Sequence, residues 1–214
     1  MKLQNGQRLL FIGDSITDTG RERPVGRRDG LGDGYVRLVN SLLGSFYPEV
    51  CINTLNTGVS GNRVTDLESR WQSDVLDLKP DWLSIMIGIN DVWRQFDDNS
   101  SSDQVTLDYY EKTLRRLVAE AKPGLIGLVL MTPFYIESNL ADPMRTRMDA
   151  YGAVVKQIAV DESAIFVDTQ AAFDEYLTQR PTQSLSGDRV HPNQTGHTIL
   201  AKAFLSAVEF NWNR

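Results

Sequence analysis

Short apolar runs alternate with longer amphipathic segments along the whole chain. Runs of consecutive apolar residues predict five buried strands, at residues 9–12, 51–55, 82–87, 125–131 and 164–167. Apolar residues that recur every three or four positions predict five helices, at residues 35–43, 63–76, 103–121, 144–160 and 194–208. Continuous apolar strands are typical of a parallel sheet that is covered on both faces. The pattern therefore predicts a three-layer α/β/α domain.

Polar clusters follow several of the predicted strands. They occupy residues 13–18, 56–62 and 88–91 after the first three strands, and residues 188–192 after the fifth. Ligands of parallel α/β sheets bind outside the carboxyl ends of the strands. We therefore expect the four clusters to meet on one rim of the sheet and to form the functional site.

A serine nucleophile needs a base that takes its proton and a third group that orients the base. The chain has two histidines, and only His191 lies in a predicted loop, with Asp188 three residues before it. His197 falls inside the last predicted helix, where a packing or surface role is expected. His191 is thus the better base and Asp188 its natural partner.

The remaining polar residues of the rim could stabilise a tetrahedral intermediate. The Asn90 amide and backbone N–H groups at Gly61 and Ser15 are suitable donors. Taken alone, Ser15 also fits a helix N-cap. Ser60 is another possible nucleophile, but stabilising its own turn is the more natural role for it. Asp14 is expected to hydrogen-bond within its turn and to hold Ser15 in place.

These clusters resemble the conserved blocks of the GDSL, or SGNH, hydrolase family, in order and spacing along nearly the whole chain. The matching stretches are Gly13-Asp14-Ser15-Ile16-Thr17, residues 56–62, Gly88-Ile89-Asn90-Asp91 and Asp188-Arg189-Val190-His191-Pro192. The resemblance implies a flavodoxin-like fold with a five-stranded parallel sheet, in one domain over residues 1–214.

The same resemblance implies roles for individual residues. Ser15 would be the nucleophile, and Asp188 and His191 would complete the catalytic triad. Backbone N–H groups of Ser15 and Gly61 and the side chain of Asn90 would form the oxyanion hole. No metal and no cofactor is implied.

Four stretches are similar, more narrowly, to intracellular bacterial acetylxylan esterases, namely residues 13–18, 85–94, 131–137 and 167–173. This likeness implies a carbohydrate O-acetyl esterase that removes acetyl groups from xylo-oligosaccharides in the cytoplasm. It also implies a homo-oligomer, an octamer being one form in such relatives.

Residues directly after the third and fourth strands are candidates for substrate binding. Trp93, Arg94, Phe134 and Tyr135 would lie on the active rim, where they could stack on a sugar or limit the acyl group. Core packing of the aromatic residues is the alternative.

Composition excludes several other classes of protein. The 22 basic and 28 acidic residues give a net charge of −6, which disfavours generic binding to nucleic acid. One cysteine, Cys51, allows no intrachain disulfide. No apolar run approaches the ~20 residues of a membrane span, and residues 1–6 do not resemble a signal peptide, so we expect a cytoplasmic protein.

Other functions are compatible with parts of the pattern. The same site could serve a broad carboxylesterase, a lipase-like esterase or a thioesterase, which differ in acyl preference. A flavodoxin-like binding module for a small molecule is the non-enzyme alternative. Asp188 and His191 could also be half of a metal site of a phosphoesterase, but no second cluster of His or Cys supports it.

Overall fold

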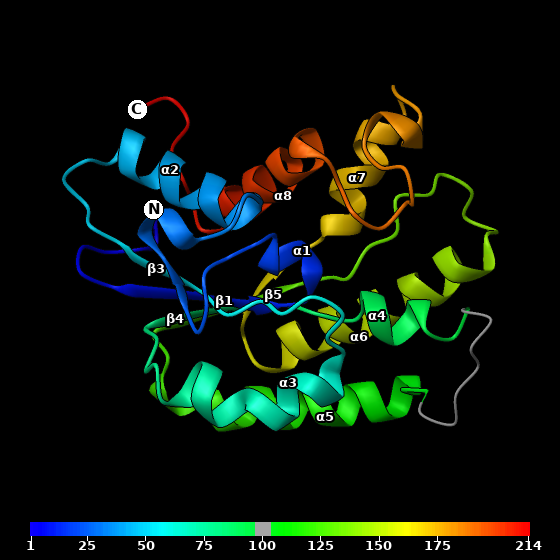
Figure 1. The fold of residues 1–214 in the computed structure, drawn as a ribbon, viewed down its shortest axis with the longest axis horizontal. Helices are drawn as coiled ribbons and strands as arrows, with labels where there is room; N and C mark the ends of the chain where they lie inside the picture. The colour runs from blue at the N-terminus through cyan, green and yellow to red at the C-terminus, as the bar shows by residue number, and fades with distance from the viewer. Residues whose placement is uncertain (97–103) are drawn as a thin grey trace.

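A mostly parallel sheet forms the middle layer of the molecule, in a computed structural model that describes residues 1–96 and 104–214 (Figure 1). Within these residues the strands follow the order β2-β3-β1-β4-β5-β6. They are β1 (Arg8–Gly13), β2 (Gly26–Arg27), β3 (Asn53–Asn56), β4 (Trp82–Met86), β5 (Gly127–Met131) and β6 (Ile165–Val167). The five longer strands are parallel, and only β2 pairs antiparallel, with β3. Their order is that of a flavodoxin-like sheet, as expected.

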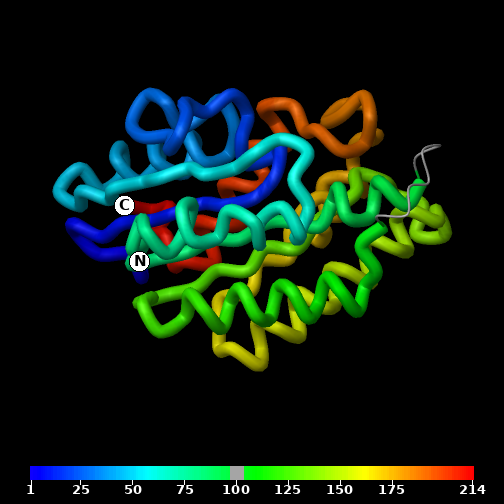
Figure 2. Tube along the Cα trace, turned by 60° about the horizontal axis from the view of Figure 1, so that its bottom comes forward, coloured from blue at the N-terminus to red at the C-terminus, as the bar shows by residue number. Residues whose placement is uncertain are grey.

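Helices cover both faces of the sheet (Figures 1 and 2). One face carries α2 (Tyr35–Phe46), α7 (Thr169–Leu177) and α8 (Gln194–Ala207). The other carries α3 (Val64–Trp71), α5 (Leu107–Ala121) and α6 (Pro143–Asp161). Short helices α1 (Ser15–Asp18) and α4 (Ile89–Trp93) begin close behind β1 and β4.

The core is built around the central strand β1. Residues 9–12 of this strand are completely buried, because helices cover both of its faces. On the side of α2 and α8, the Phe11 ring packs against Tyr35 and Phe204, with centroids 5.6 and 4.9 Å apart. The continuous apolar run in the sequence follows from this double burial.

The structure confirms the predicted strands and helices with shifts of a few residues at their ends. The predicted helix 63–76 is α-helical only to Trp71 and ends in a π-helical turn, Gln72–Leu76. The start of the predicted helix 103–121 lies outside the described residues. The pattern did not predict β2, α1, α4 or α7, because elements of two to nine residues show too little periodicity.

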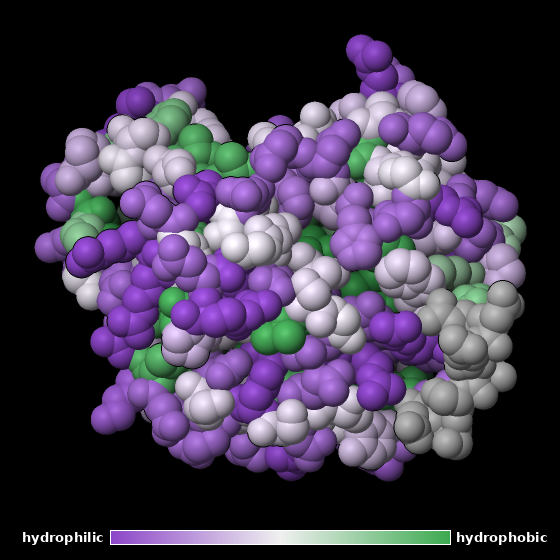
Figure 3. Space-filling model, viewed as in Figure 1, coloured by the Kyte–Doolittle hydropathy of each residue, from purple (hydrophilic) through white to green (hydrophobic). Residues whose placement is uncertain are grey.

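The carboxyl ends of the parallel strands form a rim at one end of the molecule. Both chain termini lie at the opposite end (Figures 1 and 2). The face shown in Figure 3 is mainly hydrophilic, with apolar residues in small separate patches. None of the described helices has the length and apolar character needed to cross a bilayer.

Candidate active site

Three side chains from distant parts of the sequence form a hydrogen-bonded chain on the rim. Ser15 begins α1, directly behind β1, and its Oγ lies 2.9 Å from Nε2 of His191. Nδ1 of His191 lies 2.7 Å from Oδ2 of Asp188. This geometry suits a neutral imidazole that donates its Nδ1–H to the carboxylate and accepts the Ser15 hydroxyl proton.

The Asp188 carboxylate is held by a tight turn of its own backbone. Its Oδ1 accepts hydrogen bonds from the backbone N–H groups of Val190 and His191 and from the hydroxyl of Ser186, at 2.8–2.9 Å. Although partial burial acts to raise the pKa of Asp188, the hydrogen bonds from His191, Val190 and Ser186 hold it well below the usual range. Asp188 is therefore ionised wherever a histidine can act as a base.

The triad is accessible from solvent. The side chains of Asp188 and His191 are each 46% exposed, and Ser15 is half-buried. Trp93 stands beside the base, with its ring centroid 6.0 Å from that of His191 and the ring planes at 62°. A substrate can thus reach Ser15 without a deep channel, and Trp93 borders the reacting centre.

The turn between β1 and α1 fixes the position of Ser15. Asp14 is the N-cap of α1 and accepts the N–H of Ile16 at 3.0 Å, which confirms its expected role within the turn. Burial raises the pKa of Asp14 to about 7. A Cβ at Gly13 would lie 2.4 Å from the carbonyl oxygen of Met86 and 2.5 Å from Oγ1 of Thr17, so this turn needs glycine.

The three predicted oxyanion donors lie in the segments that directly follow β1, β3 and β4. Gly61 has φ +81°, a conformation that favours glycine. Among the residues described, the N–H groups of Ser15 and Gly61 donate to no protein acceptor. Nδ2 of Asn90 donates to the carbonyl of Asn62 at 3.0 Å, which leaves its second N–H for a ligand. These groups have the chemistry of an oxyanion hole.

Arg70 on α3 fixes the loop that carries Gly61. Its guanidinium donates to the carbonyl oxygens of Gly13 and Thr57 and to Oδ1 of Asn62, at 2.6–3.0 Å. It therefore ties the turn before Ser15 to both ends of the β3–α3 loop.

Asp18 fixes the same loop from the other side. Its Oδ2 accepts the N–H and the hydroxyl of Ser60, and its carboxylate pairs with Arg23. The buried Arg21 donates to the carbonyl oxygen of Gly58 at 2.6 Å. The Ser60 hydroxyl thus binds an aspartate that is paired with Arg23, not a histidine, and Ser60 has the structural role expected of it. The roles of Arg21 and Arg70 could not be predicted from the sequence pattern, because their partners are far away along the chain.

Asp91 connects the third block of the site to the second. Its carboxylate accepts the N–H of Val64, the first residue of α3, at 3.0 Å. Burial raises the pKa of Asp91 to about 7. Asn90 is directly before Asp91, and Gly61 is three residues before Val64. This hydrogen bond therefore fixes the two oxyanion donors relative to each other.

The predicted substrate-binding residues differ in their access to the rim. Tyr135 is only 4% exposed, and the guanidinium of Arg189 lies 5.0 Å from its ring centroid, so its ring has little room for a sugar. Phe134 is fully buried against Phe173, as the alternative of core packing expected. Trp93 is half-buried beside His191, and Arg94 follows it as the exposed C-cap residue of α4.

His197 has a structural role. It is buried, and its Nδ1 accepts the N–H of Tyr35 at 3.2 Å. No group of three or more His, Cys, Asp or Glu side chains in the described part of the chain is arranged to hold a metal ion.

Comparison with known proteins gives consistent matches over the whole chain. The family model described as GDSL-like lipase/acylhydrolase matches residues 11–199. An acetylxylan esterase of Geobacillus stearothermophilus is 57% identical, over 100% of this chain and 99% of the relative. The crystal structure of that esterase, Axe2, superposes with a TM-score of 0.98 and covers the same shares of both chains.

Structures of variants of this relative are also similar. Catalytic mutants of Axe2 replace its serine 15, and an aspartate and a histidine that are three residues apart, as Asp188 and His191 are here. LAE5, an α/β hydrolase enzyme from the metagenome of Lake Arreo in Spain, is 46% identical over 98% of both chains, with a TM-score of 0.95.

Proposed function

This chain belongs to the GDSL-like lipase/acylhydrolase family, and from this premise we propose that it is a carbohydrate O-acetyl esterase. Its substrates are acetylated xylo-oligosaccharides. The substrate class is supported by the 57% identity, over the full chain, to an acetylxylan esterase. The reaction type is supported by the chain of hydrogen bonds from Ser15 through His191 to Asp188, which is the single observation that carries the proposal.

The first half of the reaction forms an acyl-enzyme. His191 Nε2 takes the hydroxyl proton of Ser15, and Ser15 Oγ attacks the carbonyl carbon of the acetyl group. The negative charge that develops on the carbonyl oxygen is stabilised by N–H groups of Ser15, Gly61 and Asn90. The bond between the carbonyl carbon and the sugar oxygen then breaks. His191 gives its proton to this oxygen, which leaves as a hydroxyl group of the sugar.

The second half hydrolyses the acetyl-serine. His191 takes a proton from water, and the resulting hydroxide attacks the same carbonyl carbon. When the second tetrahedral intermediate collapses, Ser15 recovers its proton from His191, and acetic acid leaves and releases its own proton to solvent as acetate. The ionised Asp188 stabilises the imidazolium in both halves and keeps the ring oriented.

Acetate release by the wild type and by Ser15→Ala tests this proposal. The two substrates are 4-nitrophenyl acetate, which has no sugar, and acetylated xylobiose. We expect the wild type to hydrolyse both and Ser15→Ala to lose about 10⁴-fold or more in kcat. Ser60→Ala is the matched control and should keep more than about a tenth of the activity, since the Ser60 hydroxyl only donates to Asp18.

Each possible failure has a distinct meaning. An active Ser15→Ala variant would exclude Ser15 as the nucleophile. Hydrolysis of 4-nitrophenyl acetate alone would support a serine esterase but not a xylo-oligosaccharide substrate, and a broad carboxylesterase would then be the better assignment.

We further propose that residues 1–214 form one hydrolase domain that works in the cytoplasm as a homo-oligomer, with an octamer as the form to test first. The basis is the resemblance to intracellular acetylxylan esterases. Light scattering on the purified protein would give the assembly size, and a monomer at micromolar concentration would contradict the oligomer.

A further inference from the structure

Arg189 has an unusual backbone conformation at the centre of the catalytic segment. It lies between Asp188 and His191 and has φ +65°, in the left-handed region of backbone conformation that residues other than glycine rarely adopt. Strained residues of this kind persist only where surrounding contacts hold them. The contacts of Arg189 therefore bear on the geometry of the triad.

The left-handed residue determines how the segment folds around the carboxylate. After it, the N–H groups of Val190 and His191 both donate to Oδ1 of Asp188, at 2.9 and 2.8 Å. The other oxygen, Oδ2, is thereby left to face Nδ1 of His191. Relaxation of Arg189 to an ordinary conformation would turn these N–H groups away and misalign the base with Ser15.

Both the backbone and the side chain of Arg189 are bound to the loop after β5. Its carbonyl oxygen accepts the N–H of Ile136 at 2.9 Å. Its guanidinium donates to Oε2 of Glu137 at 2.8 Å and lies over the ring of Tyr135. The Asp142 carboxylate, whose Oδ2 lies 3.6 Å from Nη1 of Arg189, adds a second negative charge. Residues 135–137 thus form a clamp on Arg189.

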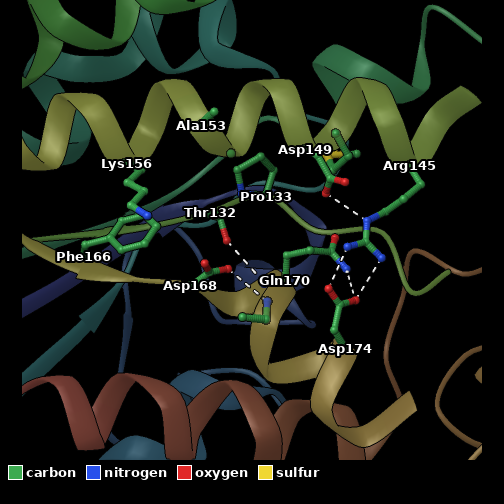
Figure 4. Close-up of a pocket in the computed structure, with 13 residues that line it drawn as sticks. Thr132, Pro133, Arg145, Asp149, Ala153, Lys156, Phe166, Asp168, Gln170 and Asp174 are labelled. Carbon is green, nitrogen blue, oxygen red and sulfur yellow. Dashed lines mark hydrogen bonds and ion pairs between the residues drawn. The ribbon is translucent and has the colours of Figure 1, made fainter. Parts of the chain in front are cut away.

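The clamp is itself fixed to two helices. Gln170 on α7 accepts the N–H of Tyr135 and donates to its carbonyl oxygen. Arg145 on α6 is almost fully buried and donates to the carbonyl oxygen of Glu137 at 2.6 Å. Figure 4 shows that Arg145 and Gln170 converge on Asp174, which pairs with both. The loop after β5 therefore provides a rigid anchor.

We propose that Arg189 is a positioning residue for the triad, which aligns Asp188 and His191 because residues 135–137 hold it in its left-handed conformation. The inference rests on the proposed function of that triad. Arg189 itself need not touch the substrate, and its side chain acts through the backbone of the catalytic segment. An ordinary surface ion pair would have no such effect on catalysis.

Arg189→Ala removes the side-chain contacts but keeps the strain of φ +65°. Glycine adopts φ +65° without strain, so Arg189→Gly loses the same contacts without the strain and should lose less activity. We expect the kcat of Arg189→Ala to fall about 10- to 100-fold, equally for 4-nitrophenyl acetate and acetylated xylobiose, with KM changed less than about threefold. Arg189→Lys keeps a donor for Glu137 and should recover part of the loss.

Two further variants complete the design. Glu137→Gln weakens the same contact from the other side, and we expect a loss of about threefold or more in kcat. Combined with Arg189→Ala, it should add little, because one contact is lost only once. Arg116→Ala is the matched control, because the side chain of Arg116 is 46% exposed, against 45% for Arg189. Arg116 pairs with Glu68 on α3 and Glu120 on α5, away from the catalytic segment.

Two results would overturn the proposal. One is a wild-type kcat in Arg189→Ala. The other is a raised KM for acetylated xylobiose alone with kcat unchanged, which would make Arg189 a substrate contact. If Arg189→Ala does not fold, the kcat of Glu137→Gln decides, and an unchanged value contradicts the clamp. An active Ser15→Ala variant would instead refute the proposed function, so the two failures are distinguishable.

Discussion

At the scale of single residues, the site combines three reactive groups with donors that are already in place. Ser15, His191 and Asp188 are aligned by two short hydrogen bonds. Charge that develops on a substrate oxygen would meet N–H groups that need no rearrangement, because neighbouring contacts hold Gly61 and Asn90. Such preorganised donors contribute most of the rate enhancement in many acyl-transfer enzymes.

Loss of one oxyanion donor should affect the chemical step more than binding. We expect Asn90→Ala to lower kcat by about 10²–10³-fold and to leave KM within a few-fold, because the donor acts mainly in the transition state. Steady-state kinetics with 4-nitrophenyl acetate measures this, and thermal unfolding checks that the variant is folded. An effect below about threefold would remove Asn90 from the oxyanion hole.

Trp93 should limit the size of the acyl group. Its ring borders His191, so Trp93→Ala should raise kcat/KM for 4-nitrophenyl butyrate relative to the acetate by at least about threefold. Trp212→Ala is the control, because Trp212 packs against Phe46 and Phe210 instead. An unchanged ratio of the two esters in Trp93→Ala would show that another group sets the acyl preference.

At the scale of elements, the helices are joined by polar contacts that no single element contains. Helix α2 begins after Gly34, which has no side chain to cap it. The missing acceptor comes from α8, where His197 accepts the N–H of Tyr35. A Cβ at Gly34 would lie 3.0 Å from the His197 ring and 2.7 Å from Oγ1 of Thr19, so the glycine allows this close contact.

The cap predicts a loss of stability in acid. Burial lowers the pKa of His197 from 6.5 to about 4. The unfolded chain therefore binds a proton below pH 6.5 that the folded protein takes up only near pH 4. The resulting loss in unfolding free energy grows as the pH falls through this window, to at most about 3 kcal/mol.

His197→Gln provides the measurement, since Gln can accept the same N–H but does not titrate. Urea unfolding at pH 7, 6, 5 and 4.5 should show that the wild type loses stability relative to the variant as the pH falls. A constant difference between the two proteins would contradict the assignment of the cap to a neutral His197.

At the scale of the whole molecule, the buried aspartate and arginine side chains of the described residues gather near one end of the sheet. Asp14 and Asp91 lie behind the nucleophile and the oxyanion donors, and both are almost fully buried. Burial raises the pKa of each to about 7, from an ordinary value of 3.8. Their effect on stability has the opposite sign to that of His197.

The folded protein binds protons on Asp14 and Asp91 between pH 3.8 and about 7, whereas the unfolded chain releases them. Their contribution to stability is therefore present at low pH and lost as the pH rises through about 7. The side chain of Asp91→Asn cannot ionise. The unfolding free energy of this variant should therefore rise relative to that of the wild type as the pH increases from 4.5 to 8. A gap that stays constant or narrows over this range would exclude an elevated pKa at Asp91.

Features that depend on local pattern could be predicted from the amino-acid sequence alone. Continuous apolar runs located all five parallel strands, because a doubly covered sheet demands them. The clusters behind those strands then pointed to Ser15, His191 and Asp188, since parallel strands bring their carboxyl ends to one rim. Spacing alone was enough to pair His191 with Asp188, which are three residues apart.

The contacts that hold these residues in place are visible only in the folded molecule. Arg21, Arg70 and Arg145 bind backbone carbonyls, and such contacts leave no periodic signal because any residue supplies the acceptor. The left-handed Arg189 was equally hidden, since its conformation depends on Glu137, 52 residues away. Burial of Tyr135 was also undecided, because its place after a strand fits both the rim and the core. Long-range packing, and not local preference, sets all of these features.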